Sequence, residues 1–213
     1  MPAIALHPRA FGLRAAAIAA TLALAVAHAQ PQDREQRETQ RLMEELASGK
    51  EAVGSDFELH DPAGRKRRLT DFRGKVVAIY FGYTFCPDVC PTGLLEIARA
   101  LRSLGKRAND IQVLFITLDP ARDTPALLGR YTRAFHPRIL ALRGSEAETQ
   151  RIARAFKVYY ERVDTPGSPY YVINHTAFTF LLDRHGRYND FIPPGTPAGR
   201  IAFMLEELAA SGK

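Results

Sequence analysis

Two nearly continuous apolar runs, residues 75–81 and 111–118, stand out in the pattern of hydrophobic and polar positions along the chain. Runs of this length and composition are typical of strands buried on both faces of a sheet. Apolar residues at helical spacing predict helices over 91–104, 126–135, 145–156 and 196–210, and shorter apolar runs predict strands over 139–142, 176–182 and 187–192. This alternation predicts an α/β fold with a central mixed β-sheet and helices on both faces.

Shorter segments flank this pattern. Residues 56–59 and 66–69 are joined by a Pro/Gly turn and predict an added N-terminal β-hairpin, and residues 157–163 and 170–173 are strand-like around a second such turn. Residues 30–54 are polar and charged with a thin apolar stripe, which indicates a solvated, partly helical linker. The globular domain is therefore expected over 55–213.

The N-terminus has the organisation of a targeting segment. Arg9 and Arg14 precede an apolar run over 15–27, and Ala27-His28-Ala29 has the small-x-small pattern of a cleavage site. The run is shorter than the roughly 20 residues that a membrane-spanning helix needs. We therefore predict a cleavable signal peptide over 1–29, in preference to a permanent anchor, and a periplasmic mature protein.

Net charge contributes little to the functional interpretation. The chain carries +6, and removal of the predicted signal peptide with its two arginines leaves +4. The densest basic cluster, Arg65 to Arg68, lies beside a predicted turn and is interpreted as a solvated hairpin. This scattered charge does not indicate a nucleic-acid partner.

The only two cysteines, Cys86 and Cys90, follow directly after the first buried strand. A bridge between them would close a small loop and remove little chain entropy, so stabilisation is a poor reason for the pair. Thiols near a helix N-terminus have a lowered pKa, and Pro91 predicts that the regular helix begins there. Disulfide formation, electron transfer and binding of a soft metal ion are all open to such a pair.

The three-residue gap between the cysteines favours a metal over ordinary disulfide exchange, for which two intervening residues are characteristic. Soft thiolates prefer Cu(I), Zn(II) or iron–sulfur clusters, and a structural zinc site needs four ligands, so Cu(I) with a third ligand fits best. His175, at the start of the predicted strand 176–182, is the candidate third ligand, although a lone histidine at such a position is more often structural, so position alone leaves both roles open. The remaining histidines of the mature chain are interpreted as surface residues: His60, His136 and His185.

A second polar cluster, Asp119, Arg122 and Asp123, follows the second buried strand. Sites in open α/β sheets gather at the carboxyl ends of strands. The cluster is explained either by helix capping with a local Asp–Arg pair or by a supporting role around the cysteines.

Residues 81–92, FGYTFCPDVCPT, closely resemble the signature of the Sco/SenC family of copper chaperones for cytochrome c oxidase assembly. Residues 117–125, TLDPARDTP, match the second motif of the family, and His175 falls where the family has its histidine. The resemblance covers about residues 55–208 and implies a thioredoxin-like fold.

The resemblance implies that Cys86, Cys90 and His175 bind one copper ion, as Cu(I) or Cu(II), and that the two cysteines form a redox disulfide. It implies a chaperone, not an enzyme, that delivers copper to the binuclear copper site of cytochrome c oxidase or reduces its cysteines. The expected partners are the copper-site subunit of the oxidase, through which alone the protein meets the membrane, and other copper chaperones or thiol reductants. Asn174 departs from the family, in which many members have aspartate there, and is expected to support His175.

Two alternatives share the scaffold. A thiol–disulfide oxidoreductase of the thioredoxin type would carry a proline in the loop facing the cysteines, and residues 172–177 contain none. A peroxidase is suggested only by Thr84 and Cys86, whose spacing is one residue short of the peroxidatic pattern.

Overall fold

The computed structural model describes residues 31–48, 52–164, 166–167 and 169–212, so the predicted signal peptide lies outside the described residues. Helix α2 (Pro31–Ser48) occupies most of the segment predicted as a partly helical linker. Among the described residues, no helix combines the length and the apolar character needed to cross a membrane. The boundary of the globular domain at residue 55 stays a prediction.

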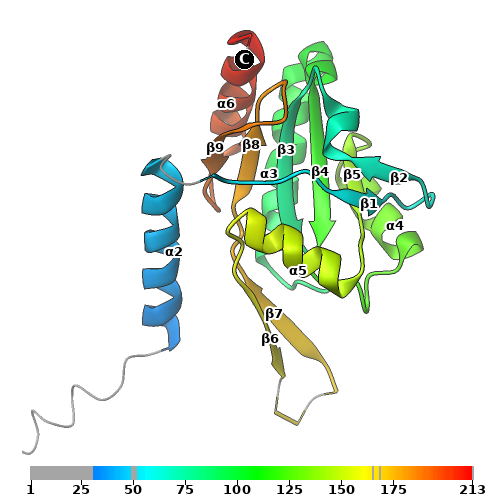
Figure 1. The fold of residues 1–213 in the computed structure, drawn as a ribbon, viewed down its shortest axis with the longest axis vertical. Helices are drawn as coiled ribbons and strands as arrows, with labels where there is room; N and C mark the ends of the chain where they lie inside the picture. The colour runs from blue at the N-terminus through cyan, green and yellow to red at the C-terminus, as the bar shows by residue number, and fades with distance from the viewer. Residues whose placement is uncertain (1–30, 49–51, 165, 168, 213) are drawn as a thin grey trace, which may run out of the picture. The chain divides into compact units, whose positions relative to one another are not determined.

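Five strands form the central sheet in the order β5-β4-β3-β8-β9 (Figure 1). Strands β3 (Val76–Gly82), β4 (Ile111–Thr117) and β5 (Ile139–Leu142) are parallel to one another. Strand β8 (Thr179–Leu182) runs antiparallel to β3, and β9 (Tyr188–Ile192) runs antiparallel to β8. The predicted mixed sheet is confirmed.

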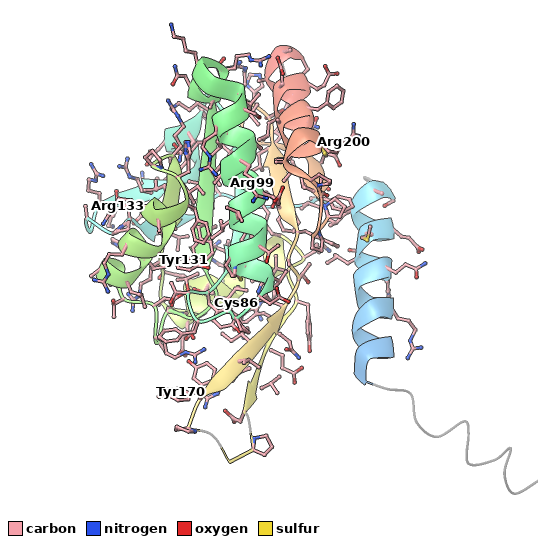
Figure 2. All side chains as sticks on the ribbon, turned by 180° about the vertical axis from the view of Figure 1, so that it is seen from behind. Cys86, Arg99, Tyr131, Arg133, Tyr170 and Arg200 are labelled. Atoms are coloured by element: carbon pink, nitrogen blue, oxygen red, sulfur yellow. The ribbon has the colours of Figure 1, made fainter. Side chains whose placement is uncertain are left out.

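Helices cover both faces of this sheet. Helices α3 (Val89–Leu104), α4 (Pro125–Phe135) and α6 (Ala198–Ala210) lie on the face seen in Figure 2. Helix α5 (Glu146–Ala155) lies on the other face, in front of the strands in Figure 1. Two short 3-10 helices, Leu69–Phe72 and Gly105–Asp110, precede β3 and β4.

The two faces of β3 show why its sequence is apolar at every position. Side chains alternate between the faces of a strand. Val76, Ala78 and Tyr80 belong to the core cluster with α3, α4 and α6. Phe81 points to the other face, where its ring centroid lies 5.5 Å from that of Phe156, the residue after α5. Burial on both faces therefore places the end of β3, and the cysteines after it, on a rigid support.

Two small antiparallel hairpins complete the fold. The predicted N-terminal hairpin consists of β1 (Glu58–His60) and β2 (Lys66–Arg68). Strands β6 (Tyr160–Asp164) and β7 (Tyr171–His175) form the second hairpin, a separate sheet. The predicted strand 176–182 is therefore wrong at its start: His175 ends β7, and the central strand β8 begins only at Thr179.

The turns 61–65 and 183–187 share one construction. In each, an aspartate Oδ1 accepts the backbone N–H groups two and four residues later, and its Oδ2 accepts the arginine Nε four residues later, at 2.8–3.0 Å. A glycine with positive φ, Gly64 at 77° or Gly186 at 81°, supplies the conformation that other residues rarely adopt. Asp61 and Asp183 are both buried by these contacts.

Candidate metal centre

Helix α3 begins at Val89, two residues before the predicted start at Pro91. The first N–H groups of a helix have no intrahelical acceptor, so a proline in the first turn removes no hydrogen bond. Cys90 therefore lies within the first turn. Its backbone N–H donates to Sγ of Cys86, with N and S 3.4 Å apart. A free helical N–H group is thus directed at one of the two sulfurs.

Gly82, the last residue of β3, leaves room for the second sulfur. A Cβ atom added at Gly82 would lie 2.7 Å from Sγ of Cys90, and 3.0 and 3.1 Å from the rings of Phe115 and Tyr80. Side-chain atoms do not approach one another so closely. The absence of a side chain at Gly82 is therefore what allows the Cys90 thiol to lie against the strand, fully buried.

His175, at the end of β7, completes a cluster of three ligand atoms. Its Nε2 lies 3.2 Å from Sγ of Cys90, and its Nδ1 lies 3.1 Å from the carbonyl oxygen of Thr176. The carbonyl accepts, so Nδ1 carries a hydrogen and Nε2 is the ring nitrogen that faces the sulfur. The ligand atoms of Cys86, Cys90 and His175 all lie within 4.8 Å of one another. Among the described residues, this is the one group of three His, Cys or acidic side chains close enough to share a metal ion.

The two thiols differ strongly in acidity. Hydrogen bonds lower the pKa of Cys86 to about 4 against the effect of burial, chiefly the bond with Cys90 and then those with His175 and the backbone of Asp88. Burial raises the pKa of Cys90, and the neighbouring Cys86 raises it further. Both cysteines are free in the structure. At neutral pH the pair is therefore one thiolate and one thiol that share a proton.

The predicted supporting residue Asp123 joins the cysteine loop to the second motif. Its fully buried carboxylate accepts the N–H of Thr84 at 3.1 Å and the hydroxyls of Thr84 and Thr117, each at 2.5 Å. Burial raises the pKa of Asp123, and the threonine contacts oppose the shift. The cap of α4 is Thr124 and not Asp123. Asp123 instead connects the loop after β3, which carries the cysteines, to the loop after β4.

Asp119 and Arg122 form the predicted ion pair, with Arg122 Nε 2.5 Å from Asp119 Oδ2. The pair also reaches β7, because the Tyr171 hydroxyl donates to Asp119 at 2.8 Å and Arg122 Nη1 donates to the Tyr171 carbonyl at 2.9 Å. Asn174 is exposed and, by strand alternation, lies on the other face of β7 from His175. A role for Asn174 in supporting His175 stays a prediction.

Two tyrosines that lie at the site, Tyr83 and Tyr171, were not identified from the sequence. The Tyr83 hydroxyl accepts the N–H of Ile173 at 3.0 Å, and its ring meets that of His175 edge to face, with centroids 5.9 Å apart. Tyr171 is the contact between β7 and the ion pair described above. Tyr171, Ile173 and His175 alternate along the strand, and this alternation was a usable signal that they share one face.

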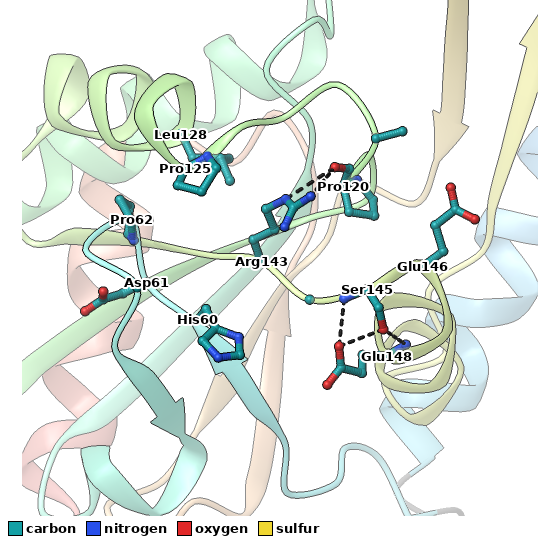
Figure 3. A pocket seen from close by; sticks show the side chains of 13 residues that line it. His60, Asp61, Pro62, Pro120, Pro125, Leu128, Arg143, Ser145, Glu146 and Glu148 are labelled. Atoms are coloured by element: carbon teal, nitrogen blue, oxygen red, sulfur yellow. Dashed lines mark hydrogen bonds between the residues drawn. The ribbon is translucent and has the colours of Figure 1, made fainter.

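The other histidines of the described residues lie apart from the cysteines. His60 lines a cavity of about 640 Å³ between the β1–β2 hairpin and the starts of α4 and α5 (Figure 3). His136 is half-buried and its Nδ1 accepts the N–H of Arg138, while His185 is exposed in a turn. No cysteine lines the cavity in Figure 3, which is therefore separate from the cluster of Cys86, Cys90 and His175.

The SCO1/SenC family model matches residues 45–210. The chain belongs to the SCO1/SenC family. A SCO2-like protein of Rickettsia conorii is 38% identical over 157 residues, which cover 73% of this chain and 77% of that protein. The mitochondrial SCO2 homologue of Homo sapiens is 35% identical over 173 residues, covering 80% of this chain and 64% of that protein.

Solved structures of family members have the same fold. ScoI of Bradyrhizobium japonicum, a structure with copper bound, superposes with a TM-score of 0.69 at 38% identity and covers 74% of this chain and 99% of its own. Yeast Sco1, also with copper bound, superposes with a TM-score of 0.68 at 33% identity, covering 76% and 90%. The expected thioredoxin-like fold is confirmed.

Proposed function

We propose that the protein is an exported copper chaperone that binds one copper ion through Cys86, Cys90 and His175. The observation that carries this proposal is the convergence of two sulfurs and one imidazole nitrogen within 4.8 Å of one another. Sulfur with imidazole is a ligand set that Cu(I) favours. Copper bound to the relatives from Bradyrhizobium japonicum and yeast supports the same assignment.

The donor set fits copper better than zinc. Structural zinc sites are closed by four protein ligands, and the described residues bring only three together here. The sulfurs are buried and the imidazole is partly exposed, so an ion would remain reachable from one side. A site with few ligands and an open side suits an ion that is cargo and must be passed on.

We place the protein in cytochrome c oxidase assembly, with delivery of copper to the binuclear site of the oxidase, or reduction of the cysteines there, as its role in the periplasm. Family membership supports this assignment, and the signal-like N-terminus supports export. The protein would meet the oxidase through its copper-site subunit, and would receive copper or electrons from other chaperones or thiol reductants.

The test is anaerobic titration of the reduced mature protein with Cu(I) in competition with a colorimetric chelator. We expect one Cu(I) per chain, loss of tight binding in Cys86→Ser and Cys90→Ser, and weaker binding in His175→Ala. X-ray absorption should show two sulfur neighbours and one nitrogen neighbour. A spectrum without copper–sulfur scattering would contradict the proposal.

A thiol–disulfide oxidoreductase is the second candidate, favoured by the acidity of Cys86. The Cys86 thiolate would attack a partner disulfide, and Cys90 would lose its proton and resolve the mixed disulfide, which leaves the partner reduced and this pair oxidised. Insulin reduction measured beside copper affinity separates the two functions. Fast insulin turnover together with weak copper binding would favour the oxidoreductase.

A further inference from the structure

Within the described residues, the third ligand is carried by a hairpin that pairs with no strand of the central sheet. Strands β6 and β7 form a two-stranded sheet of their own, whereas the cysteines follow a strand paired on both sides. In Figure 2 Cys86 lies at the lower end of α3, and the hairpin extends away from it toward Tyr170. The position of His175 relative to the sulfurs must therefore be fixed by contacts other than the sheet ladder.

Arg122 makes the densest set of these contacts. Its Nη1 donates to the Tyr171 carbonyl at 2.9 Å, and its guanidinium carbon lies 3.5 Å from the centroid of the Tyr171 ring. Its Nε pairs with Asp119 Oδ2 at 2.5 Å, while the Tyr171 hydroxyl donates to Oδ1 of the same carboxylate at 2.8 Å. The guanidinium carbon also lies 5.0 Å from the ring centroid of Phe85, beside the first cysteine. One side chain thus connects the second motif, the cysteine loop and β7.

The loop that carries Arg122 is itself fixed. On its far side, Arg143 Nη2 donates to the Pro120 carbonyl at 2.9 Å (Figure 3). At its end, buried Asp123 bonds Thr84 and Thr117. The loop is therefore tied to both neighbouring segments, and we take it as the fixed side of its contact with the hairpin.

From these contacts we propose that Arg122 is a positioning residue: with Asp119 it holds Tyr171, and through the same strand it keeps His175 within ligand distance of Cys90. This inference rests on the proposed copper function. Arg122 touches no ligand atom, and its side-chain hydrogen bonds go to Asp119 and Tyr171 and not to the cysteine loop, so we expect it to act on copper mainly through His175. Loss of the latch formed by Asp119, Arg122 and Tyr171 leaves both sulfurs in place and lets the imidazole leave.

This mechanism limits the size of the effect. Removing Arg122 should not weaken Cu(I) binding more than removing His175 does, because both variants keep the two sulfur ligands. Residues that orient a metal ligand typically change metal affinity by about 10–100-fold. We expect Arg122→Ala to lower Cu(I) affinity about tenfold, within the loss measured for His175→Ala.

A double-mutant cycle tests the proposal. Anaerobic chelator competition compares wild type, Arg122→Ala, His175→Ala and the double variant, and X-ray absorption counts nitrogen neighbours. We expect the copper complex of Arg122→Ala to lose most of its nitrogen scattering. In the His175→Ala background, adding Arg122→Ala should change the Cu(I) affinity by less than about twofold, because Arg122 acts through a ligand that is already absent. Equal losses in both backgrounds, or full nitrogen scattering in Arg122→Ala, would overturn the proposal.

Two further variants keep the test decisive. Tyr171→Phe removes only the hydroxyl bond to Asp119, so it tests the latch if Arg122→Ala does not fold. It should lower Cu(I) affinity by less than Arg122→Ala does, and it should have no effect in the His175→Ala background. Arg162→Ala is the matched control, because Arg162 also lies over the Tyr171 ring, at 3.9 Å, but bonds Asp164 of its own hairpin. A loss in Arg162→Ala equal to that in Arg122→Ala would overturn the latch. Failure of wild type to bind copper would overturn the proposed function, and the latch with it.

Discussion

Substitution of Gly82 by alanine should damage the metal centre while leaving every ligand in the chain. The added Cβ would lie 2.7 Å from Sγ of Cys90. Carbon and sulfur atoms in contact need at least the spacing of about 3.5–4.0 Å that carbon pairs prefer, so the sulfur must move by about 1 Å. Gly82 has no positive φ, so the backbone itself accepts alanine and the clash is the whole perturbation.

The structure leaves the sulfur little freedom to move. Cys90 is fully buried, and the same Cβ would also press on the rings of Phe115 and Tyr80 at 3.0 and 3.1 Å. Overpacking of this kind typically destabilises a protein by about 1–3 kcal/mol. A ligand displaced by about 1 Å should weaken Cu(I) binding by at least the roughly 10–100-fold typical of lost ligand orientation, or about 1.4–2.8 kcal/mol.

Urea denaturation of the apo protein and chelator competition for Cu(I) measure the two effects separately. Gly199→Ala in α6 is the matched control, since nothing lies within 4 Å of the added carbon. Gly199 lies in the first turn of α6, where alanine should leave stability unchanged or slightly raised and copper affinity unchanged. A Gly82→Ala variant with native stability and wild-type copper affinity would refute the reasoning, because the sulfur would then have room that the structure denies it.

Three other predictions follow from the buried acids and thiols. Cys86, with a pKa lowered to about 4 chiefly by Cys90, is already a thiolate at pH 7, so Cu(I) binding should release about one thiol proton. Titration calorimetry in buffers of different ionisation enthalpy counts the protons released on Cu(I) binding, and the His175→Ala variant restricts the count to the thiols. Release of two protons would contradict the prediction. Asp123→Ala should lower the free energy of unfolding by about 2–4 kcal/mol in urea melts, because Thr84 and Thr117 lose their buried acceptor; an unchanged midpoint would count against it. Burial alone would raise the pKa values of Asp61 and Asp183, but hydrogen bonds from Arg65 and Arg187 outweigh it and lower them. The two carboxylates therefore stabilise the folded state at pH values above the ordinary aspartate pKa of about 4, and this stabilisation is lost as pH falls through the lowered pKa values. Asp61→Asn and Asp183→Asn should accordingly lower the free energy of unfolding at pH 7, and by progressively less below pH 4.

The fold was predictable because its core strands are apolar on both faces. Residues 75–81 and 111–118 could be interpreted without tertiary information, and the helix between them fixed a parallel pair. The start of β8 was not predictable in the same way. Residues 171–182 are nearly continuous in strand propensity, and only the pairing of β7 with β6 shows that the chain changes sheets between His175 and Thr179.

The site was predictable where its residues are close in sequence. Cys86 and Cys90 flank one turn, and Asp119 and Arg122 are three residues apart, so local spacing indicated both groups. The contact of Arg122 with Tyr171 spans 49 residues, and that of Tyr83 with Ile173 spans 90. Such contacts depend on where a two-stranded hairpin packs, which no local pattern encodes.

The division of the three ligands between two kinds of support has a physical consequence. Cys86 and Cys90 follow a strand that is buried on both faces and paired on both sides, so their positions are tied to global unfolding. His175 belongs to a hairpin in whose two strands only Ile173 is buried, and elements with few buried residues open at lower free energy than the core. We therefore expect the imidazole to leave and return more easily than the sulfurs, held by the proposed Arg122 latch and by the bond of Tyr83 to Ile173. For the copper delivery proposed above this inequality is useful, because loss of the imidazole alone opens the site to an incoming ligand while the two sulfurs stay in place.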